Sequence, residues 1–331
     1  MSEIEKYKNI NDLRESGFYE LSEPEQMKFL KEKGFYEMEN QDKINFLERA
    51  GLFYLDINDD PPSPPLEPNK IDYTKSHKIN KLKSIVATKI GEIFAKKILK
   101  KKTLIIKDYV GIENMASLNS GAIVTCNHFN PFDSFSVELA FRKCKQIKNR
   151  KMFVVIREGN YTNFPGLYGF LFRNCDTLPL SSITKTMVKF LKAIDTILRR
   201  GDFVLIFPEQ SMWWNYKQPK PMKDGAFKFA VKSNVPILPS FITMADSNVI
   251  GEDGNPVQEY TIHFGNPIYP DNKLTPKENV EAMRQANYKF CKKTYETVYG
   301  KPVQYQTIIH KDIPEYVLST SGFEDSVIKD Q

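Results

Sequence analysis

The fold of this chain is decided by the stretch Ala122-Ile123-Val124-Thr125-Cys126-Asn127-His128-Phe129-Asn130-Pro131-Phe132-Asp133. Its first five residues follow Gly121 as a β-branched and apolar run, which predicts a buried strand. Asn130 and Pro131 are typical of a helix N-cap and of the first helical position. We therefore expect a strand that runs directly into a helix, which continues through Phe135, Leu139 and Phe141.

The same stretch places a histidine five residues before an aspartate. The carboxyl ends of strands face the crevice where open α/β sheets bind ligands, so His128 is expected there. Asp133 lies close enough to accept a hydrogen bond from one ring nitrogen, which leaves the other free to take a proton from a substrate hydroxyl. Two ordinary explanations stay open. A first-turn aspartate also suits the helix dipole, and a lone histidine is often a satisfied structural group.

Length and composition indicate one large α/β domain with an appendage, because the chain has 331 residues of which 41% are hydrophobic. Four widely spaced cysteines without a C-x-x-C pair argue against a disulfide scaffold or a zinc ribbon and fit a reducing cytoplasm. Four histidines without close pairs argue against a histidine-rich metal site. We expect no metal and no cofactor.

The sequence predicts at most peripheral contact with a membrane. The first 20 residues are charged and lack the apolar core of a signal peptide. The longest uncharged run, residues 114–132, contains glycine, proline and polar residues and cannot span a bilayer.

Charge is distributed unevenly along the chain, whose net charge is +6. Residues 1–60 carry 8 basic and 15 acidic residues, whereas the remainder carries 39 basic and 26 acidic ones. The acidic segment contains a 17-residue repeat, in which Gly17-Phe18-Tyr19-Glu20 recurs as Gly34-Phe35-Tyr36-Glu37 and more loosely as Gly51-Leu52-Phe53-Tyr54. Each unit resembles a short helix closed by glycine. Its aromatic residues form either the core of a small subdomain or a lid or docking element.

A proline-rich linker over residues 59–68 precedes a basic helix, which is predicted over residues 78–102 with nine lysines. Apolar residues recur in it at helical spacing: Ile79, Leu82, Val86, Ile90, Phe94 and Ile98. Such a helix suits the interface of an anionic membrane. The alternatives are an ordinary helix with its stripe against the core, and nucleic-acid binding, which we do not expect.

The remaining chain alternates predicted strands and helices, which implies a mainly parallel sheet. Strands are expected over residues 152–156, over 203–207 and from 235 onward. Helices are expected over 184–200, from about 224, and from the capping box Thr275-Pro276-Lys277-Glu278 to just before Gly300.

A second motif, Phe207-Pro208-Glu209-Gln210-Ser211, follows the predicted strand 203–207, so Glu209 also lies at a carboxyl end. The ordered set N-H-F-N-P-F-D, F-P-E-Q-S and V-P-I-L-P resembles the 1-acylglycerol-3-phosphate acyltransferase family, which carries N-H-x-x-x-x-D, F-P-E-G-T-R and V-P-[IV]-x-P in this order. The blocks Gly169–Arg173 and Lys223–Ala226 also lie where the family has similar blocks. The resemblance covers roughly residues 105–300.

The resemblance implies acyl transfer from acyl-CoA or acyl carrier protein to the free hydroxyl of a lysophospholipid, with 1-acylglycerol-3-phosphate as the first expected acceptor. His128 is then the general base and Asp133 orients it, without an enzyme nucleophile. Backbone N–H groups after His128 are expected to stabilise the oxyanion. The expected substrate-binding residues are Asn127, Glu209, Gln210, Ser211, Arg173 and Lys223. Glu209 is alternatively a buried structural carboxylate.

Two departures from the family pattern concern the acceptor. The arginine that ends F-P-E-G-T-R is Met212 here, and the arginine of I-P-[VL]-[DE]-R falls at Ser182 in Leu178-Pro179-Leu180-Ser181-Ser182. Hydroxyls do not readily replace a bidentate guanidinium. Either a nearby cation substitutes (Arg173, Arg157, Lys217 or Lys223), or the acceptor carries a different head group. Trp213-Trp214-Asn215-Tyr216 either lines a lipid pocket or packs in the core.

These observations predict a mainly parallel mixed sheet flanked by helices, as in glycerolipid acyltransferases, with a small helical N-terminal subdomain. The expected parts are an acidic repeat subdomain (1–60), a linker with a basic helix (61–104), an acyltransferase domain (105–300) and a C-terminal tail (301–331). We expect a cytoplasmic protein bound peripherally to the inner membrane face. A non-catalytic lipid-binding scaffold is the alternative from another class.

Overall fold

A seven-stranded mixed sheet organises the molecule in a computed structural model that describes residues 10–147, 149–252 and 254–328. The sheet has the order β1-β7-β6-β2-β5-β3-β4, and only β6 and β7 pair antiparallel. Its strands are β1 (Ile105–Val110), β2 (Ala122–Thr125), β3 (Met152–Ile156), β4 (Thr177–Pro179), β5 (Phe203–Ile206), β6 (Ile237–Ile250) and β7 (Pro256–Phe264). The predicted fold class, a mainly parallel sheet flanked by helices, is confirmed.

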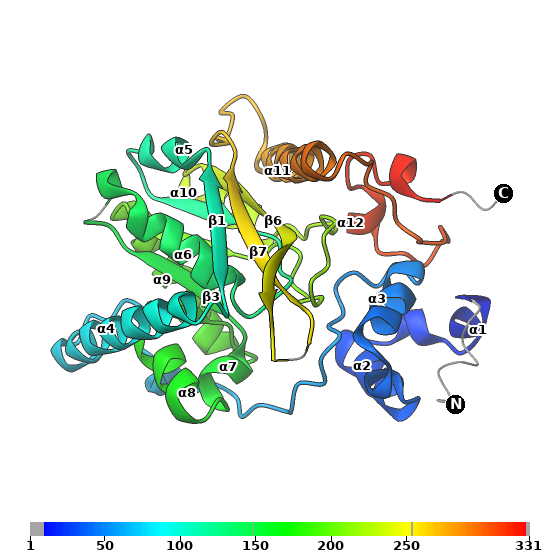
Figure 1. Cartoon of the computed structure of the whole chain (residues 1–331), viewed down its shortest axis with the longest axis horizontal. Helices are drawn as coiled ribbons and strands as arrows, with labels where there is room; N and C mark the ends of the chain where they lie inside the picture. The colour runs from blue at the N-terminus through cyan, green and yellow to red at the C-terminus, as the bar shows by residue number, and fades with distance from the viewer. Residues whose placement is uncertain (1–9, 148, 253, 329–331) are drawn as a thin grey trace.

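Helices cover both faces of the sheet (Figure 1). Alternate residues of β2 contact opposite cores, because successive side chains of a strand point to opposite faces. Ile123 packs with residues of α9, α10 and α11, and Val124 packs with residues of α4, α5 and α6. These helices are α4 (Lys78–Lys100), α5 (Ile112–Ala116), α6 (Asp133–Lys143), α9 (Thr184–Arg199), α10 (Gly225–Ser233) and α11 (Pro276–Tyr299).

The helix after β2 begins later than the sequence predicts. Its first residue is Asp133 and its N-cap is Phe132, not Asn130. The reason is a turn, in which the Asn130 side chain accepts a hydrogen bond from Phe132 N–H at 2.9 Å and the Asn130 carbonyl accepts one from Asp133 N–H at 3.1 Å. Residues 130–133 therefore form a separate turn that leads into α6. The predicted capping box at Thr275 and Glu278 is present in α11.

The acidic repeat forms three short helices, α1 (Ile10–Glu15), α2 (Glu23–Glu32) and α3 (Asn40–Arg49), and residues 1–9 lie outside the described part of the chain. Gly17, Gly34 and Gly51 follow them at φ values of 72°, 79° and 70°, a region that favours glycine. The aromatic residues behind these glycines, Phe18, Phe35 and Phe53, are fully buried. The repeat therefore builds a core.

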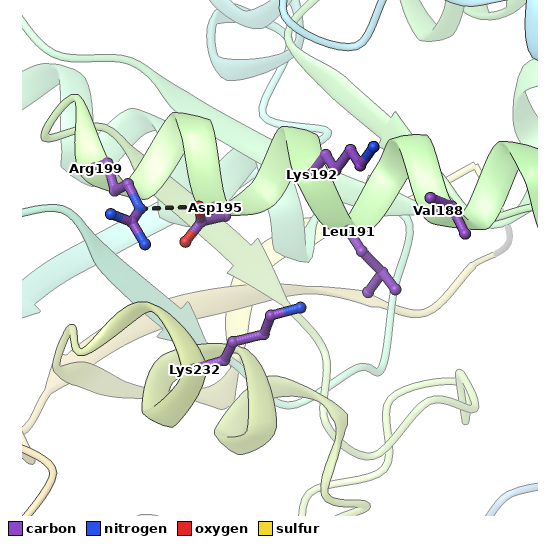
Figure 2. Close-up of a pocket in the computed structure, with 6 residues that line it drawn as sticks. All are labelled: Val188, Leu191, Lys192, Asp195, Arg199 and Lys232. Carbon is purple, nitrogen blue, oxygen red and sulfur yellow. Dashed lines mark hydrogen bonds and ion pairs between the residues drawn. The ribbon is translucent and has the colours of Figure 1, made fainter.

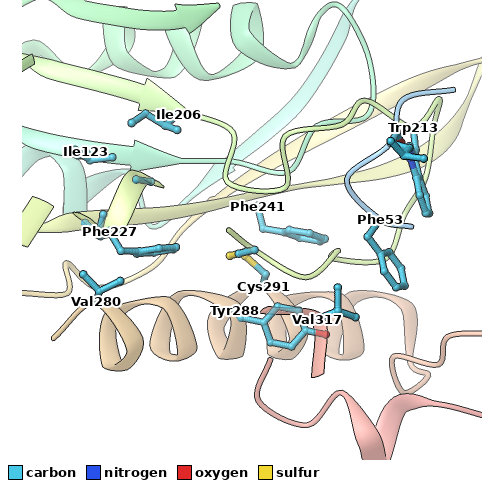
Figure 3. Packing of buried hydrophobic residues seen from close by; sticks show 14 of the residues in the cluster. Phe53, Ile123, Ile206, Trp213, Phe227, Phe241, Val280, Tyr288, Cys291 and Val317 are labelled. Atoms are coloured by element: carbon cyan, nitrogen blue, oxygen red, sulfur yellow. The ribbon is translucent and has the colours of Figure 1, made fainter. Parts of the chain in front are cut away.

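This core continues into the sheet domain. Figure 3 shows Phe53 beside Trp213, in one cluster with Phe241 of β6 and Tyr288 of α11. The C-terminal segment closes the same region, since Thr307 donates to the Glu48 carbonyl at 2.7 Å. It carries α12 (Glu315–Leu318) beside the N-terminal helices (Figure 1).

Residues 56–75, which we call the strap, connect this region to α4. The strap runs along one side of the molecule past α7 (Glu158–Thr162) and α8 (Gly166–Asn174) (Figure 1). Leu66 N–H donates to the Glu158 carboxylate at 2.6 Å, and the Tyr73 hydroxyl donates to the Pro179 carbonyl at 2.8 Å. The strap therefore lies against the carboxyl ends of β3 and β4.

The basic helix α4 ends at Lys100, two residues earlier than expected. None of the helices in the described part of the chain combines the length and the apolar composition that crossing a bilayer requires.

Candidate active site

The histidine and aspartate of the opening stretch are in contact. His128 Nδ1 lies 2.6 Å from Asp133 Oδ2. Asp133 is 1% exposed, and its carboxylate also accepts backbone N–H groups from Phe129 at 3.2 Å and Ser134 at 2.6 Å. A carboxylate held in this way fixes Nδ1 as the protonated nitrogen. Because no described residue hydrogen-bonds to Nε2, that nitrogen can accept a proton from a bound hydroxyl.

An aromatic ring supports the imidazole. Phe207 stacks on His128 with ring centroids 4.3 Å apart and an angle of 25° between the planes. The two residues follow β5 and β2, which are adjacent strands. Phe207 was not among the site residues expected from the sequence, although its place at the end of the predicted strand 203–207 was the available signal.

Glu209 is buried in the loop that follows β5. It is 2% exposed; one carboxylate oxygen accepts His128 N–H at 3.2 Å and the other accepts Lys220 N–H at 2.9 Å. Burial raises the pKa of Glu209, and the Lys220 ammonium at 3.8 Å opposes that rise. Its contacts fit the structural alternative and hold the His128 backbone in place.

Lys220 lies in the core beside this carboxylate. Its Nζ donates to the Ser211 carbonyl at 2.6 Å and to the Ser211 hydroxyl at 2.8 Å, and lies 4.7 Å from the centre of the Trp213 ring. Burial lowers the pKa of Lys220 to about 8, against the opposing pull of Glu209 and more distant Asp56 and Asp133. Sequence reasoning missed this residue, because a lysine in the polar run 217–223 looks like a surface group.

The other predicted substrate-binding residues next to the motifs have partners within the fold. The Asn127 side chain bridges to β6, since it donates to the Ile242 carbonyl at 3.1 Å and accepts Ile242 N–H at 2.8 Å. Ser211 is buried and donates to the Phe53 carbonyl at 2.5 Å. Gln210 is exposed, with a left-handed φ of 66°. Of these three residues, only Gln210 faces solvent.

The cations that were expected to replace the missing arginines also have partners. Arg173 donates to the Tyr161 and Phe164 carbonyls at 3.2 and 3.0 Å. Lys223 lies 3.8 Å from the Glu23 carboxylate, and Lys217 lies 5.9 Å from the centre of the Tyr299 ring. Arg157 forms ion pairs with two aspartates of the strap, Asp56 and Asp60.

The tryptophan cluster is divided between the core and the surface. Trp213 is fully buried, stacks on Phe53 at 5.5 Å and donates its ring N–H to the Leu55 carbonyl at 2.8 Å. Trp214 is 43% exposed. Core packing therefore accounts for Trp213, and only Trp214 is available to a ligand.

The backbone N–H groups expected to hold the oxyanion are largely engaged. The N–H groups of Phe129 and Ser134 bind Asp133, and those of Phe132 and Asp133 bind Asn130. This expectation from the sequence is wrong for these four groups, since they serve the turn and the carboxylate.

A separate surface pocket lies between α9 and α10 (Figure 2). Asp195 within it is bound by Arg199 at 2.8 Å and by Ser233 at 3.1 Å. The pocket contains neither His128 nor Asp133, and it is lined by Val188, Leu191, Lys192, Asp195, Arg199 and Lys232.

Comparison with known proteins finds one matching family model. Residues 107–243 match the family model described as Acyltransferase, a segment that contains His128, Asp133 and the loop after β5. No curated protein sequence is significantly similar to the chain. The crystal structure of the 1-acyl-sn-glycerophosphate (LPA) acyltransferase PlsC from Thermotoga maritima is 18% identical; the match covers 68% of this chain and 84% of that chain with a TM-score of 0.46. The chain is therefore similar to the Acyltransferase family over residues 107–243.

Proposed function

We propose that this chain transfers a fatty acyl group from the thioester of acyl-CoA or acyl carrier protein to the free hydroxyl of a lysophospholipid. The observation that carries the proposal is the contact between His128 Nδ1 and the buried Asp133 carboxylate at 2.6 Å. The contact lies within the segment that matches the acyltransferase family model.

His128 is the general base in this reaction. Nε2 removes the proton from the acceptor hydroxyl as its oxygen attacks the thioester carbonyl. The tetrahedral intermediate collapses when the C–S bond breaks, and the imidazolium returns the proton to the leaving thiolate. Asp133 stabilises the imidazolium during both steps, and Glu209 keeps His128 in place through its backbone N–H.

The resemblance of the motifs implies 1-acylglycerol-3-phosphate as the first acceptor to assay. The second candidate is a different lipid acceptor, one that lacks the usual phosphate clamp. It is favoured by the ion pairs that occupy Arg157, which follows β3 at the same edge of the sheet as His128.

Binding to the surface of an anionic membrane completes the proposal. Small residues of α4, including Ala87 and Ala95, are buried against the protein, whereas Ile79, Leu82 and Ile93 are 69%, 63% and 67% exposed. Lysines lie on the same exposed side of α4, and a basic helix with exposed apolar residues is typical of the membrane interface. An ordinary core helix would bury these large residues instead, as α4 does near its end with Ile98. We expect the protein to act at the inner, cytoplasmic face.

Exposed residues of the neighbouring helix extend the apolar surface of α4. Helices α4 and α8 pack together, and Phe94 contacts Tyr168 with ring centroids 5.5 Å apart (Figure 1). Leu167 and Tyr168 of α8 are 45% and 43% exposed, and Phe164, which lies just before α8, is 43% exposed. We infer that one membrane surface contacts both helices.

An acceptor panel with labelled acyl-CoA and labelled acyl carrier protein tests the proposal, with products separated by lipid class. Formation of a diacyl lipid above the rate without enzyme supports acyl transfer. Lipid binding without any product would favour the non-catalytic scaffold. Salt-dependent binding to DNA but not to vesicles would favour a nucleic-acid-binding protein.

A further inference from the structure

The strap places two carboxylates on an arginine at the carboxyl edge of the sheet. Arg157 directly follows β3, and its guanidinium donates to Asp56 at 2.8 Å and to Asp60. Asp56 is 3% exposed, whereas the side chains of Arg157 and Asp60 are 43% and 52% exposed. The arginine is therefore reachable from solvent, but its charge is already matched by two acids of the same chain.

Arg157 and His128 belong to the same edge. Val154 pairs with Leu205 and Thr125 pairs with Ile206, so the two residues leave the sheet at nearly the same level. They are separated by one intervening strand, β5, which corresponds to about 10 Å between their backbones. That spacing suits an acceptor whose hydroxyl meets His128 while its head group extends toward β3.

Hydrogen bonds link the strap to the His128 loop. Asp56 accepts Met212 N–H at 3.2 Å with the same oxygen that binds Arg157, and the next residue, Trp213, donates its N–H to the His128 carbonyl at 3.3 Å. Met212 and Ser182 stand where the family pattern has arginines. Ser182 N–H donates to the Glu158 carboxylate at 3.0 Å. The backbone N–H group of each position therefore binds a carboxylate.

We propose that Asp56 and Asp60 set the head-group specificity of the acyltransferase by neutralising Arg157, so that the acceptor carries no phosphomonoester and no net negative charge. This inference rests on the proposed function. A dianionic phosphate would have to displace Asp60 from the guanidinium and would meet the fixed charges of Asp56 and Glu158. An uncharged or zwitterionic head group avoids both costs.

The test compares three acceptors with the same acyl chain: a monoacylglycerol, lysophosphatidylcholine and 1-acylglycerol-3-phosphate. Wild-type protein is expected to use at least one of the first two with roughly tenfold higher kcat/KM than the phosphomonoester. Asp60→Asn should shift the ratio toward the phosphomonoester by roughly three- to tenfold. Asp59→Asn is the matched control, because Asp59 pairs with Lys31 at 2.7 Å and is expected to leave the ratio within about twofold.

Preference of the wild-type protein for the phosphomonoester, or equal ratios in the two variants, would overturn the inference. Calorimetric binding of 1-hexanoylglycerol and 1-hexanoylglycerol-3-phosphate to the His128→Ala variant gives a readout without turnover. Gain of phosphomonoester binding in His128→Ala/Asp60→Asn supports the inference even if no acceptor is acylated, and absence of a gain contradicts it. Failure of acylation with all three acceptors would count against the proposed function alone.

Discussion

The carboxyl ends of β2 and β3 carry two polar side chains in similar positions, and their surroundings differ. His128 has one nitrogen bound to Asp133 and the other without a described partner. Arg157 has its guanidinium bound to two aspartates that come from the strap. Position at a strand end makes a residue a candidate for function. Its ability to bind or react with a substrate then depends on whether neighbouring protein groups already occupy its hydrogen-bonding atoms.

The helices α4 and α9 differ in the same way in the burial of their apolar residues. Both have apolar residues at helical spacing, but α9 buries its large residues, including Phe190, Ile194 and Ile197, whereas α4 exposes Ile79 and Leu82. The stripe of α9 is part of the core. In α4, Ile98 of the predicted stripe is buried in the core, whereas Ile79, Leu82 and Val86 remain available to another surface.

The largest effect is expected when the support of His128 is removed. Asp133→Asn should lower kcat by roughly 10³-fold, because an amide neither fixes the same tautomer nor stabilises the imidazolium. Acyl transfer at saturating acceptor measures it. The matched control is Asp195→Asn, since Asp195 pairs with Arg199 on the surface of α9. A loss of less than tenfold in Asp133→Asn would contradict the role given to Asp133 as the group that supports His128.

Replacement of the buried Lys220 tests the ion pair with Glu209, the carboxylate that binds His128 N–H. Lys220→Met should lower the free energy of unfolding by about 3 kcal/mol, because it leaves the buried Glu209 carboxylate without its cation. Urea unfolding measures the change. Lys217→Met should change stability by less than about 0.5 kcal/mol, since Lys217 is exposed. Partial recovery is expected in Lys220→Met/Glu209→Gln, and equal stability of both single variants would contradict this account.

Vesicle binding sharpens the comparison of the helices. Leu82→Ser in α4 should weaken binding to vesicles that contain anionic lipid by roughly tenfold, because it removes a side chain that is expected to be buried in the interface. Val188→Ser in α9 is the control, because Val188 is also exposed, at 45%, but lies outside the α4 face. Sedimentation with vesicles measures both. Equal binding by the two variants would contradict the membrane contact and favour the alternative, in which α4 is an ordinary helix packed against the protein.

The smallest effect concerns the start of α4. Burial alone would raise the pKa of Asp72, but hydrogen bonds from His77 N–H, the Asn80 side chain and Ser76 lower it to about 2. Because the folded-state pKa lies below the unfolded value, this stabilisation is present at neutral pH and is lost as the pH falls from about 4 toward 2. Asp72→Asn should therefore cost about 1 kcal/mol at pH 7 and less at pH 3. A difference that does not change with pH would contradict it.

Local patterns in the sequence predicted the individual strands and the histidine–aspartate contact, because both depend on residues close together in the chain. The buried strands and the capping box at Thr275 are examples. Contacts between distant segments carried no local signal. Two examples are the burial of Lys220, which lies in a polar run, and the contact of Asp56 with Arg157. Both depend on how separate segments pack. The helix α6 begins later than predicted because the hydrogen bond to the Asn130 side chain competes with helix formation.

The central claim is that His128 is the general base of an acyltransferase. The most direct measurement is the rate of diacyl lipid formation by purified His128→Ala, beside wild-type protein and the control His77→Ala, whose histidine is exposed at the start of α4. We expect a loss of at least about 10³-fold in His128→Ala, with unchanged circular dichroism and vesicle binding, and wild-type rates in His77→Ala. A folded His128→Ala protein that retains near wild-type turnover would contradict the claim.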